Sequence, residues 1–378
     1  MKKIKRNHDL IFLNQDLKKL YSFKNFPIFM GATNKKRSEC KFSEMCFYIS
    51  KKSGFIQLNP LIPLNLLYPY SHNSGCIGKL WNKHHFKFAK FVLKQKPSKV
   101  LEIGGSHGIL ASEVHKYKKN TYWKIIEPNP RPIKNSKAIF KKGYFDDVYK
   151  DKINYDTIVH SHVLEHIYDL NKFFKNLEKF SSEGTKLIFS IPNMEVMLKK
   201  KYNNCLNFEH TVFLTVPYVK YFLSKYSFKL MKISYFLSDH SIFFYAKRSN
   251  DIKINNLKKS LFKKNKKIFM NYINHYLNII KKINIKLNKF KNPFFLFGGH
   301  IFSQYLLEFG LNKSKIISIL DNDPNKQNKF LYGTNLKIKS PQILKNFKNP
   351  VVLLRAGAYD KEIKKDILKN INKNTIFI

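Results

Sequence analysis

Hydrophobic and polar positions alternate in two kinds of block along the middle of the chain. Short apolar runs of strand length take turns with segments in which apolar side chains recur every three or four residues, the period of an amphipathic helix. The predicted strands read KVLEIGG, YWKIIEPN, YDTIVHSHVLEH and TKLIFSIPN, and the predicted helices read HGILASEVHKY and LNKFFKNLEKF. Strands that alternate with helices predict a parallel sheet with helices on both faces, an α/β Rossmann-like fold.

The flanking sequence predicts the other parts of the chain. The first part mixes short apolar runs with Gly, Pro, Asn and Ser, a helix is expected over residues 80–93, and a helix with two strand-like runs closes the central domain. A long amphipathic pattern in a lysine-rich background follows, and a second β-α-β pattern begins after Pro293. We expect a small irregular N-terminal module at 1–78, a central domain at 79–250, a helical connector at 251–292 and a second Rossmann-like domain at 293–378.

A glycine-rich turn follows the first strand of the central domain. Its residues are Glu102, Ile103, Gly104, Gly105, Ser106, His107 and Gly108. Glycines let the backbone approach a ligand without a Cβ clash. The next strand ends in Glu127, where a carboxylate can accept hydrogen bonds from both hydroxyls of a ribose. The alternative is a structural turn with a surface glutamate, but turn, helix and acidic strand end together favour an adenosine-binding site.

Further residues point to S-adenosylmethionine rather than to a nicotinamide cofactor. An acidic residue at the position of Glu102 is typical of methyltransferases, and HSHVLEHIYDL resembles the segment after the fourth strand of many S-adenosylmethionine enzymes. We expect Ser161 and His162 beside the methionine end of the cofactor, and Phe145 and Asp146 near its adenine. Helix capping and core packing remain the alternatives for the histidines of this segment.

Composition changes this picture little. The chain of 378 residues carries a formal net charge of +45, almost all of it from lysine, whereas readers of bases and phosphates depend on arginine. We expect no nucleic-acid partner, although a positive field would attract an anionic substrate such as a sugar nucleotide. No signal-like or membrane-length apolar run is present, so we expect a cytoplasmic protein without membrane insertion. The four scattered cysteines predict no disulfide framework.

Three segments resemble the sugar C-methyltransferase family, which acts on nucleotide-linked keto-deoxysugars. They are SGFIQLNPLIPLNLLYPYSHNSG, NFEHTVFLT, and FGGHIFSQYLL followed by LDNDPNKQNKFLYGT. The resemblance covers nearly the whole chain and implies a zinc module, a class I methyltransferase domain and a C-terminal Rossmann-like domain that binds substrate. Where the family has paired zinc-binding cysteines this chain has Ser50 and Ser53, so the module is degenerate and we expect no metal.

The resemblance also implies a reacting centre. In the family's Tyr-x-Glu-His stretch this chain reads Asn207-Phe208-Glu209-His210, which keeps the Glu and the His but not the tyrosine. Methylation of a carbon beside a ketone needs a base for the α-proton and donors for the enolate oxygen. We expect His210 as the base, Glu209 to orient it or to bind a sugar hydroxyl, and Tyr70 or His72 to donate to the oxyanion.

Three other functions remain open from the sequence. O-methylation of a sugar or a small hydroxy acid would use the same base, and the missing tyrosine favours it. A binding protein that kept the fold without the cofactor would be expected to have lost Glu102 or Glu127, and both are present. A nucleic-acid methyltransferase would carry an Asn/Asp-Pro-Pro-Tyr-like motif where this chain reads IPNM.

Overall fold

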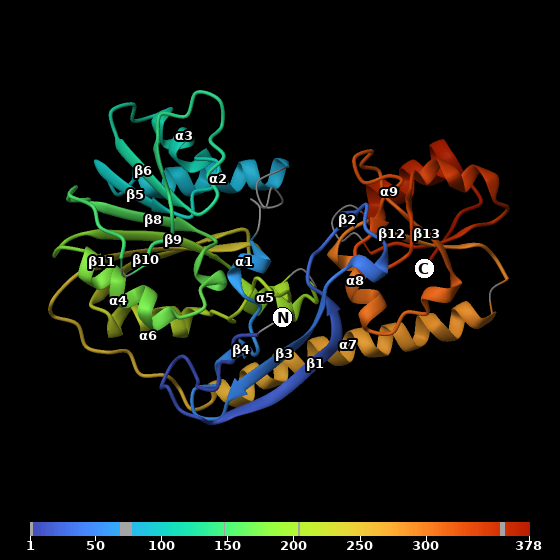
Figure 1. Ribbon diagram of the computed structural model, residues 1–378, viewed down its shortest axis with the longest axis horizontal. Coiled ribbons are helices and arrows are strands. Elements are labelled where there is room, and N and C mark those ends of the chain that lie inside the picture. Colours follow the sequence, from blue (N-terminus) through green and yellow to red (C-terminus); the bar gives the residue numbers. More distant parts are fainter. Residues whose placement is uncertain (1–2, 69–77, 147, 203–204, 290, 356–359) are drawn as a thin grey trace. The chain divides into compact units, whose positions relative to one another are not determined.

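The computed structural model describes residues 3–68, 78–146, 148–202, 205–289, 291–355 and 360–378 (Figure 1). The chain divides into two compact units, each made of three segments. The first unit comprises Met1–Lys19, Phe47–Lys200 and Phe208–Lys266, and the second comprises Leu20–Cys46, Lys201–Asn207 and Lys267–Ile378.

A seven-stranded sheet forms the centre of the first unit, with the strand order β10-β11-β9-β8-β5-β6-β7. Neighbours from β9 to β7 pair in parallel, and β11 pairs antiparallel with both β9 and β10. The strands are β5 (Lys99–Ile103), β6 (Tyr122–Glu127), β7 (Ile139–Lys142), β8 (Thr157–Ser161), β9 (Lys186–Pro192), β10 (Phe228–Phe236) and β11 (Ser241–Arg248). The predicted α/β Rossmann-like fold with a closing hairpin is confirmed.

Helices cover both faces of this sheet (Figure 1). They are α2 (Lys79–Leu93), α3 (Ile109–His115), α4 (Leu170–Phe180) and α6 (Val216–Lys225), and α5 (Met194–Lys199) follows β9. Side chains alternate along β5, so Leu101 and Ile103 join the core with α4 and α6, while Val100 packs with α2 and α3. All three are buried because a parallel sheet between two helix layers leaves neither face to water.

The N-terminal region does not form the separate irregular module expected at 1–78. It contributes β1 (Leu17–Pro27), β2 (Ala32–Thr33), β3 (Phe42–Ser50), β4 (Ile56–Leu58) and α1 (Leu64–Leu67). The strands β1, β3 and β4 form one sheet, and the boundary between the two units falls within β1 and within β3. Residues 20–46 join the second unit, where β2 pairs with β14 (Phe330–Leu331). Pairing between distant segments therefore decides the division, and local composition does not show it.

Two serines occupy the positions where the resembling family has zinc-binding cysteines. The Ser50 hydroxyl donates to Asp16 at 3.0 Å, and the Ser53 hydroxyl donates to the buried Asp9 at 3.0 Å. The backbone N–H of Ser53 in turn donates to the Ser50 hydroxyl at 3.0 Å. Hydrogen bonds between these serines and aspartates thus connect residues 50–53 to residues 9–16 within the first unit.

The second unit contains a five-stranded sheet of order β15-β13-β12-β16-β17, in which all paired strands are parallel. Its strands are β12 (Phe294–Phe297), β13 (Ile316–Leu320), β15 (Ile338–Lys339), β16 (Val351–Leu353) and β17 (Ile376–Phe377), with helices α8 (Ile301–Glu308) and α9 (Asp360–Asp366). The predicted second Rossmann-like fold is confirmed. The predicted connector is one helix, α7 (Leu261–Lys289), and the unit boundary falls within it. Among the helices of the described residues, none has the length and hydropathy needed to cross a membrane.

Candidate functional site

The glycine-rich turn between β5 and α3 has the backbone that its sequence predicts. Gly104 and Gly108 have φ values of +71° and +73°, in the left-handed region that favours glycine. A Cβ on Gly105 would lie 2.7 Å from the Glu102 side chain and 2.8 Å from that of Ile125, so a larger residue does not fit there. The turn is closed by Gly108, whose N–H donates to the Gly105 carbonyl at 2.8 Å.

Glu127 stands at the end of β6, directly beside this turn. One carboxylate oxygen accepts from the backbone N–H of Ser106 at 3.1 Å, and the other accepts from that of Asn129 at 3.0 Å. Each carboxylate oxygen can accept two hydrogen bonds, so acceptor capacity remains on both. The two backbone donors fix the orientation of the Glu127 carboxylate.

Glu102 is buried at the end of β5. Its carboxylate accepts a hydrogen bond from the Trp123 indole N–H at 2.7 Å. The residue is 3% exposed. Burial raises the pKa of Glu102 to about 7, an effect that the Trp123 hydrogen bond reduces and the nearby Glu127 increases. A cationic ligand at this turn would favour the ionised form of Glu102.

The structure locates the other four predicted cofactor residues in the first unit. Phe145 packs in the core against the Phe173 and Phe180 rings, with centroids 5.9 and 5.5 Å away, and Asp146 accepts from the backbone N–H of Val148 at 3.2 Å. Their place near an adenine stays a prediction. Ser161 is the last residue of β8 and His162 follows it, and the Ser161 hydroxyl lies 2.7 Å from that of Ser190 on β9.

His210 lies beside a second histidine, His166, which the sequence analysis did not assign to the site. Their ring centroids are 5.1 Å apart, and one Glu209 carboxylate oxygen lies 4.0 Å from His166 Nδ1. The Tyr68 hydroxyl lies 3.0 Å from the same nitrogen, and a Glu165 oxygen lies 3.8 Å from His166 Nε2. The structure thus gathers two histidines, two glutamates and a tyrosine.

Backbone hydrogen bonds hold this cluster together. Thr211, next to His210, donates its N–H to the Glu165 carbonyl at 2.8 Å and its hydroxyl to the Ile167 carbonyl at 3.0 Å. The buried Arg6 guanidinium donates to the carbonyls of Thr211 at 3.0 Å and Tyr168 at 2.6 Å. The segment after β9 is therefore fastened to the segment after β8, which brings His210 to His166.

Tyr70 and His72, the predicted oxyanion donors, lie outside the described residues. Tyr68, two residues earlier, provides a hydroxyl at the cluster, and burial, with Glu209 second, raises its pKa well above the ordinary value. Its carbonyl accepts from the Asn129 side chain at 3.4 Å, and Asn129 follows Glu127 by two residues. The reacting cluster and the cofactor turn are thereby connected. The spacing HVLEH could have indicated His166, because it repeats the Glu-His pair of Glu209 and His210.

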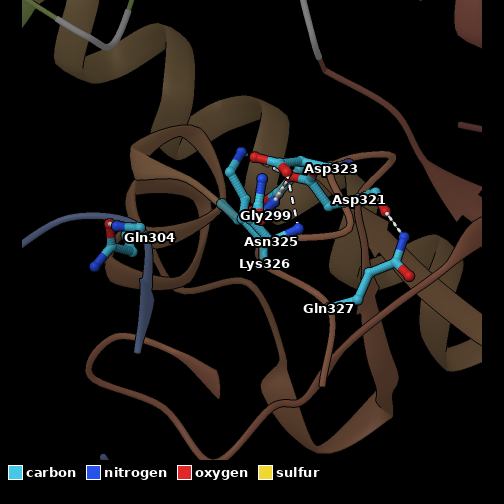
Figure 2. A network of polar contacts seen from close by, with 10 residues as sticks. Gly299, Gln304, Asp321, Asp323, Asn325, Lys326 and Gln327 are labelled. Atoms are coloured by element: carbon cyan, nitrogen blue, oxygen red, sulfur yellow. Dashed lines mark hydrogen bonds and ion pairs between the residues drawn. The ribbon is translucent and has the colours of Figure 1, made fainter. Parts of the chain in front are cut away.

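The second unit repeats the turn and its acidic partner (Figure 2). The Gly299 N–H donates to an Asp321 carboxylate oxygen at 2.8 Å, as Ser106 does to Glu127 in the first unit. Lys326 also binds that oxygen at 3.1 Å, and the Asp323 N–H donates to the other at 2.9 Å. The ammonium group of Lys326 pairs with the Asp321 carboxylate, so these contacts stabilise the turn without a ligand. Substrate binding by this unit stays a prediction.

Comparison with known proteins finds a similarity over the central part of the chain. Residues 81–239 match a family model described as a methyltransferase domain. No curated protein matches the chain. The match covers six of the seven strands of the sheet, the glycine turn, Glu127, and His166, Glu209 and His210 of the cluster.

The solved structures to which the chain is similar share little sequence with it. N,N-8-amino-8-demethyl-D-riboflavin dimethyltransferase from Streptomyces davawensis is 15% identical, with a TM-score of 0.36 over 44% of this chain and 55% of that one. An S-adenosylmethionine-dependent methyltransferase from Mesorhizobium loti is 11% identical, with a TM-score of 0.35 over 42% of this chain and 98% of that one. Human N-acetylserotonin methyltransferase is 11% identical, with a TM-score of 0.35 over 50% of this chain and 63% of that one. The chain spans little more than half the length of the first of these.

Residues 81–239 of the chain therefore resemble a methyltransferase domain. S-Adenosylmethionine is the cofactor of this class. The residues of the turn are compatible with this cofactor, because the carboxylates of Glu102 and Glu127 lie beside the turn at strand ends and Glu127 keeps acceptor capacity for a ribose.

Proposed function

We propose that this enzyme methylates a small-molecule acceptor, and that the acceptor is a nucleotide-activated keto sugar methylated at carbon. The observation that carries the proposal is the meeting of His210, His166 and Tyr68 in the unit that holds the cofactor turn. A base, a second imidazole and a phenol are the groups that enolate chemistry needs. The family resemblance of NFEHTVFLT supports a keto sugar of surface polysaccharide biosynthesis as the acceptor.

Each group has a defined task in this reaction. His210 removes the proton from the carbon beside the ketone, and His166 and Glu209 lie where they orient the base or bind a sugar hydroxyl. The Tyr68 hydroxyl stays protonated because burial raises its pKa, so it can donate to the enolate oxygen. The 102–108 turn and Glu127 would hold the cofactor, which would supply a methyl group on a sulfonium. The enolate carbon would bond to this methyl group as the bond between the methyl carbon and sulfur breaks and the neutral thioether leaves, and His210 would then release the α-proton to water.

O-methylation of a sugar or a hydroxy acid is the second candidate. It is favoured by Asn207, which stands where the resembling family has tyrosine. His210 would then remove a hydroxyl proton, and no α-hydrogen would exchange.

Turnover of keto-deoxysugar nucleotides by the His210→Ala variant tests the base. We expect a loss of about 10²- to 10⁴-fold in kcat with cofactor affinity nearly unchanged, because the cofactor turn is separate from the base. The exposed His8 offers a matched control, and His8→Ala should keep full turnover. Full activity of His210→Ala would remove it as the base.

Deuterium exchange separates the two acceptor classes. A C-methyltransferase exchanges the α-hydrogen of its substrate in deuterated water, and His210→Ala should lose this exchange as well. Methyl transfer to a hydroxyl acceptor without exchange would overturn C-methylation and leave His210 as the base.

A further inference from the structure

Three histidines from separate segments of the first unit meet at one point. His84 lies in α2, His162 follows β8, and His240 lies between β10 and β11. Each offers one ring nitrogen, and these three nitrogens all lie within 4.8 Å of one another. The centroid of the His84 ring is 5.2 Å from that of His162 and 5.4 Å from that of His240.

His84 is buried there without the partners that a buried imidazole needs. It is 0% exposed, and within the described part of the chain neither of its ring nitrogens has a hydrogen-bond partner. Leaving such a group unpaired costs about 1–3 kcal/mol, and buried polar groups in native proteins are nearly always satisfied. A ligand that accepts the lone pair of this ring would remove that cost.

Polar groups contact two of the three rings. Glu165 Oε1 lies 3.2 Å from His162 Nδ1, and a carboxylate at this distance can orient the imidazole ring. The Ser241 hydroxyl lies 2.8 Å from His162 Nε2 and 2.6 Å from His240 Nδ1, and so holds both rings in place.

An aromatic shell surrounds the three rings. The Trp81 ring centroid lies 5.3 Å from that of His84, 5.1 Å from His162 and 5.0 Å from His240. The Phe243 ring centroid lies 5.4 Å from that of His84. An apolar shell limits access of water and strengthens binding of a cation by lone pairs.

We propose that His84, His162 and His240 bind a divalent transition-metal ion of the zinc type. Three imidazoles suit zinc, copper, cobalt or nickel, whereas calcium and magnesium require oxygen ligands. Tetrahedral zinc holds nitrogens at about 2.0–2.1 Å, which places two of them about 3.4 Å apart. The rings therefore close by at most about 1.4 Å from their present separation.

The ion joins α2, the end of β8 and the β10–β11 turn, and it leaves a fourth coordination position open.

The expectation of no metal rested on the missing cysteines of the N-terminal region. The three histidines are separated by 78 residues in each interval (84 to 162 and 162 to 240), so their spacing matches no local metal motif.

Metal content of the purified full-length chain tests the proposal. The protein is stripped with a chelator, dialysed against micromolar Zn²⁺ and analysed for zinc, and Co²⁺ is used in a parallel sample for its visible absorption. We expect one ion per chain, cobalt bands of a low-coordinate nitrogen site, and quenching of tryptophan fluorescence by Co²⁺ that Trp81→Phe reduces. Zn²⁺ should also raise the melting temperature, because an ion that binds only the folded state stabilises it.

Two variants and one matched control make the result specific. His84→Leu should abolish uptake and the rise in melting temperature, and His240→Ala, at a partly exposed position, gives the same answer if His84→Leu fails to fold. His160→Leu is the control, since His160 is equally buried and its nitrogens also lack partners in the described chain, but it stacks on Phe189 outside the cluster. No uptake by the unsubstituted chain would overturn the proposal, as would uptake retained in both variants.

One further outcome would move the ion elsewhere. Glu165, His166 and His210 also place three ligand atoms within 4.8 Å of one another. Zinc retained in His84→Leu and lost in His210→Ala would assign the ion to that second cluster and overturn the three-histidine site. The readouts do not depend on turnover, so failure of this proposal is distinguishable from failure of the proposed methylation.

Discussion

Replacing Glu102 by glutamine should make the first unit more stable at neutral and alkaline pH. Glutamine has the same shape, and its carbonyl oxygen can accept the hydrogen bond that Trp123 now donates at 2.7 Å. What the substitution removes is a carboxylate that is 3% exposed. The folded protein has to ionise this group in a buried position, whereas the unfolded chain ionises it in water.

The magnitude follows from the pKa of Glu102, which burial raises from 4.5 to about 7. The folded state therefore binds the proton more tightly than the unfolded state, and stability falls as the pH rises from about 4.5 to about 7. Each unit of pKa corresponds to about 1.4 kcal/mol, so the full cost above pH 7 is about 3 kcal/mol. We expect Glu102→Gln to unfold with a free energy about 2–3 kcal/mol higher than the unsubstituted chain at pH 8, and with little difference at pH 4.5.

Urea unfolding at the two pH values measures this difference. Trp81 and Trp123 both lie in the first unit, so tryptophan fluorescence reports its unfolding. Glu183→Gln removes the same charge from an exposed position and should change stability little at either pH. Equal stabilities of Glu102→Gln and the unsubstituted chain at pH 8 would refute the reasoning, as would a gain that does not depend on pH.

Two further substitutions test the cofactor turn and the contacts that hold the cluster. Glu127→Ala should weaken S-adenosylmethionine binding by about 1–3 kcal/mol in calorimetry, because the ribose loses its acceptor, and unchanged affinity would take Glu127 out of the site. Arg6→Met should lower the free energy of unfolding by at least about 2 kcal/mol, since the carbonyls of Thr211 and Tyr168 lose charged hydrogen bonds in the interior; a thermal melt identical to that of the unsubstituted chain would contradict this.

The sequence by itself determined the elements whose signal is local. The apolar runs and helical periods of the central domain correspond to β5, β6, β8, β9 and the helices between them, because each element buries its own apolar stripe. The predicted helix over residues 80–93 is α2, and the connector is α7. The conformation of the glycine-rich turn was also predictable, since Gly104 and Gly108 take the left-handed backbone that glycine favours.

Only the tertiary structure decided how distant segments combine. The N-terminal strands pair across long sequence separations, so composition suggested one irregular module where the structure divides residues 1–78 between two units. His166 and Tyr68 join His210 because Thr211 and Arg6 fasten three segments together through backbone carbonyls, which any sequence provides. For the same reason His84, His162 and His240 carry no local signal, and their convergence depends on the packing of α2 against the sheet and its closing hairpin.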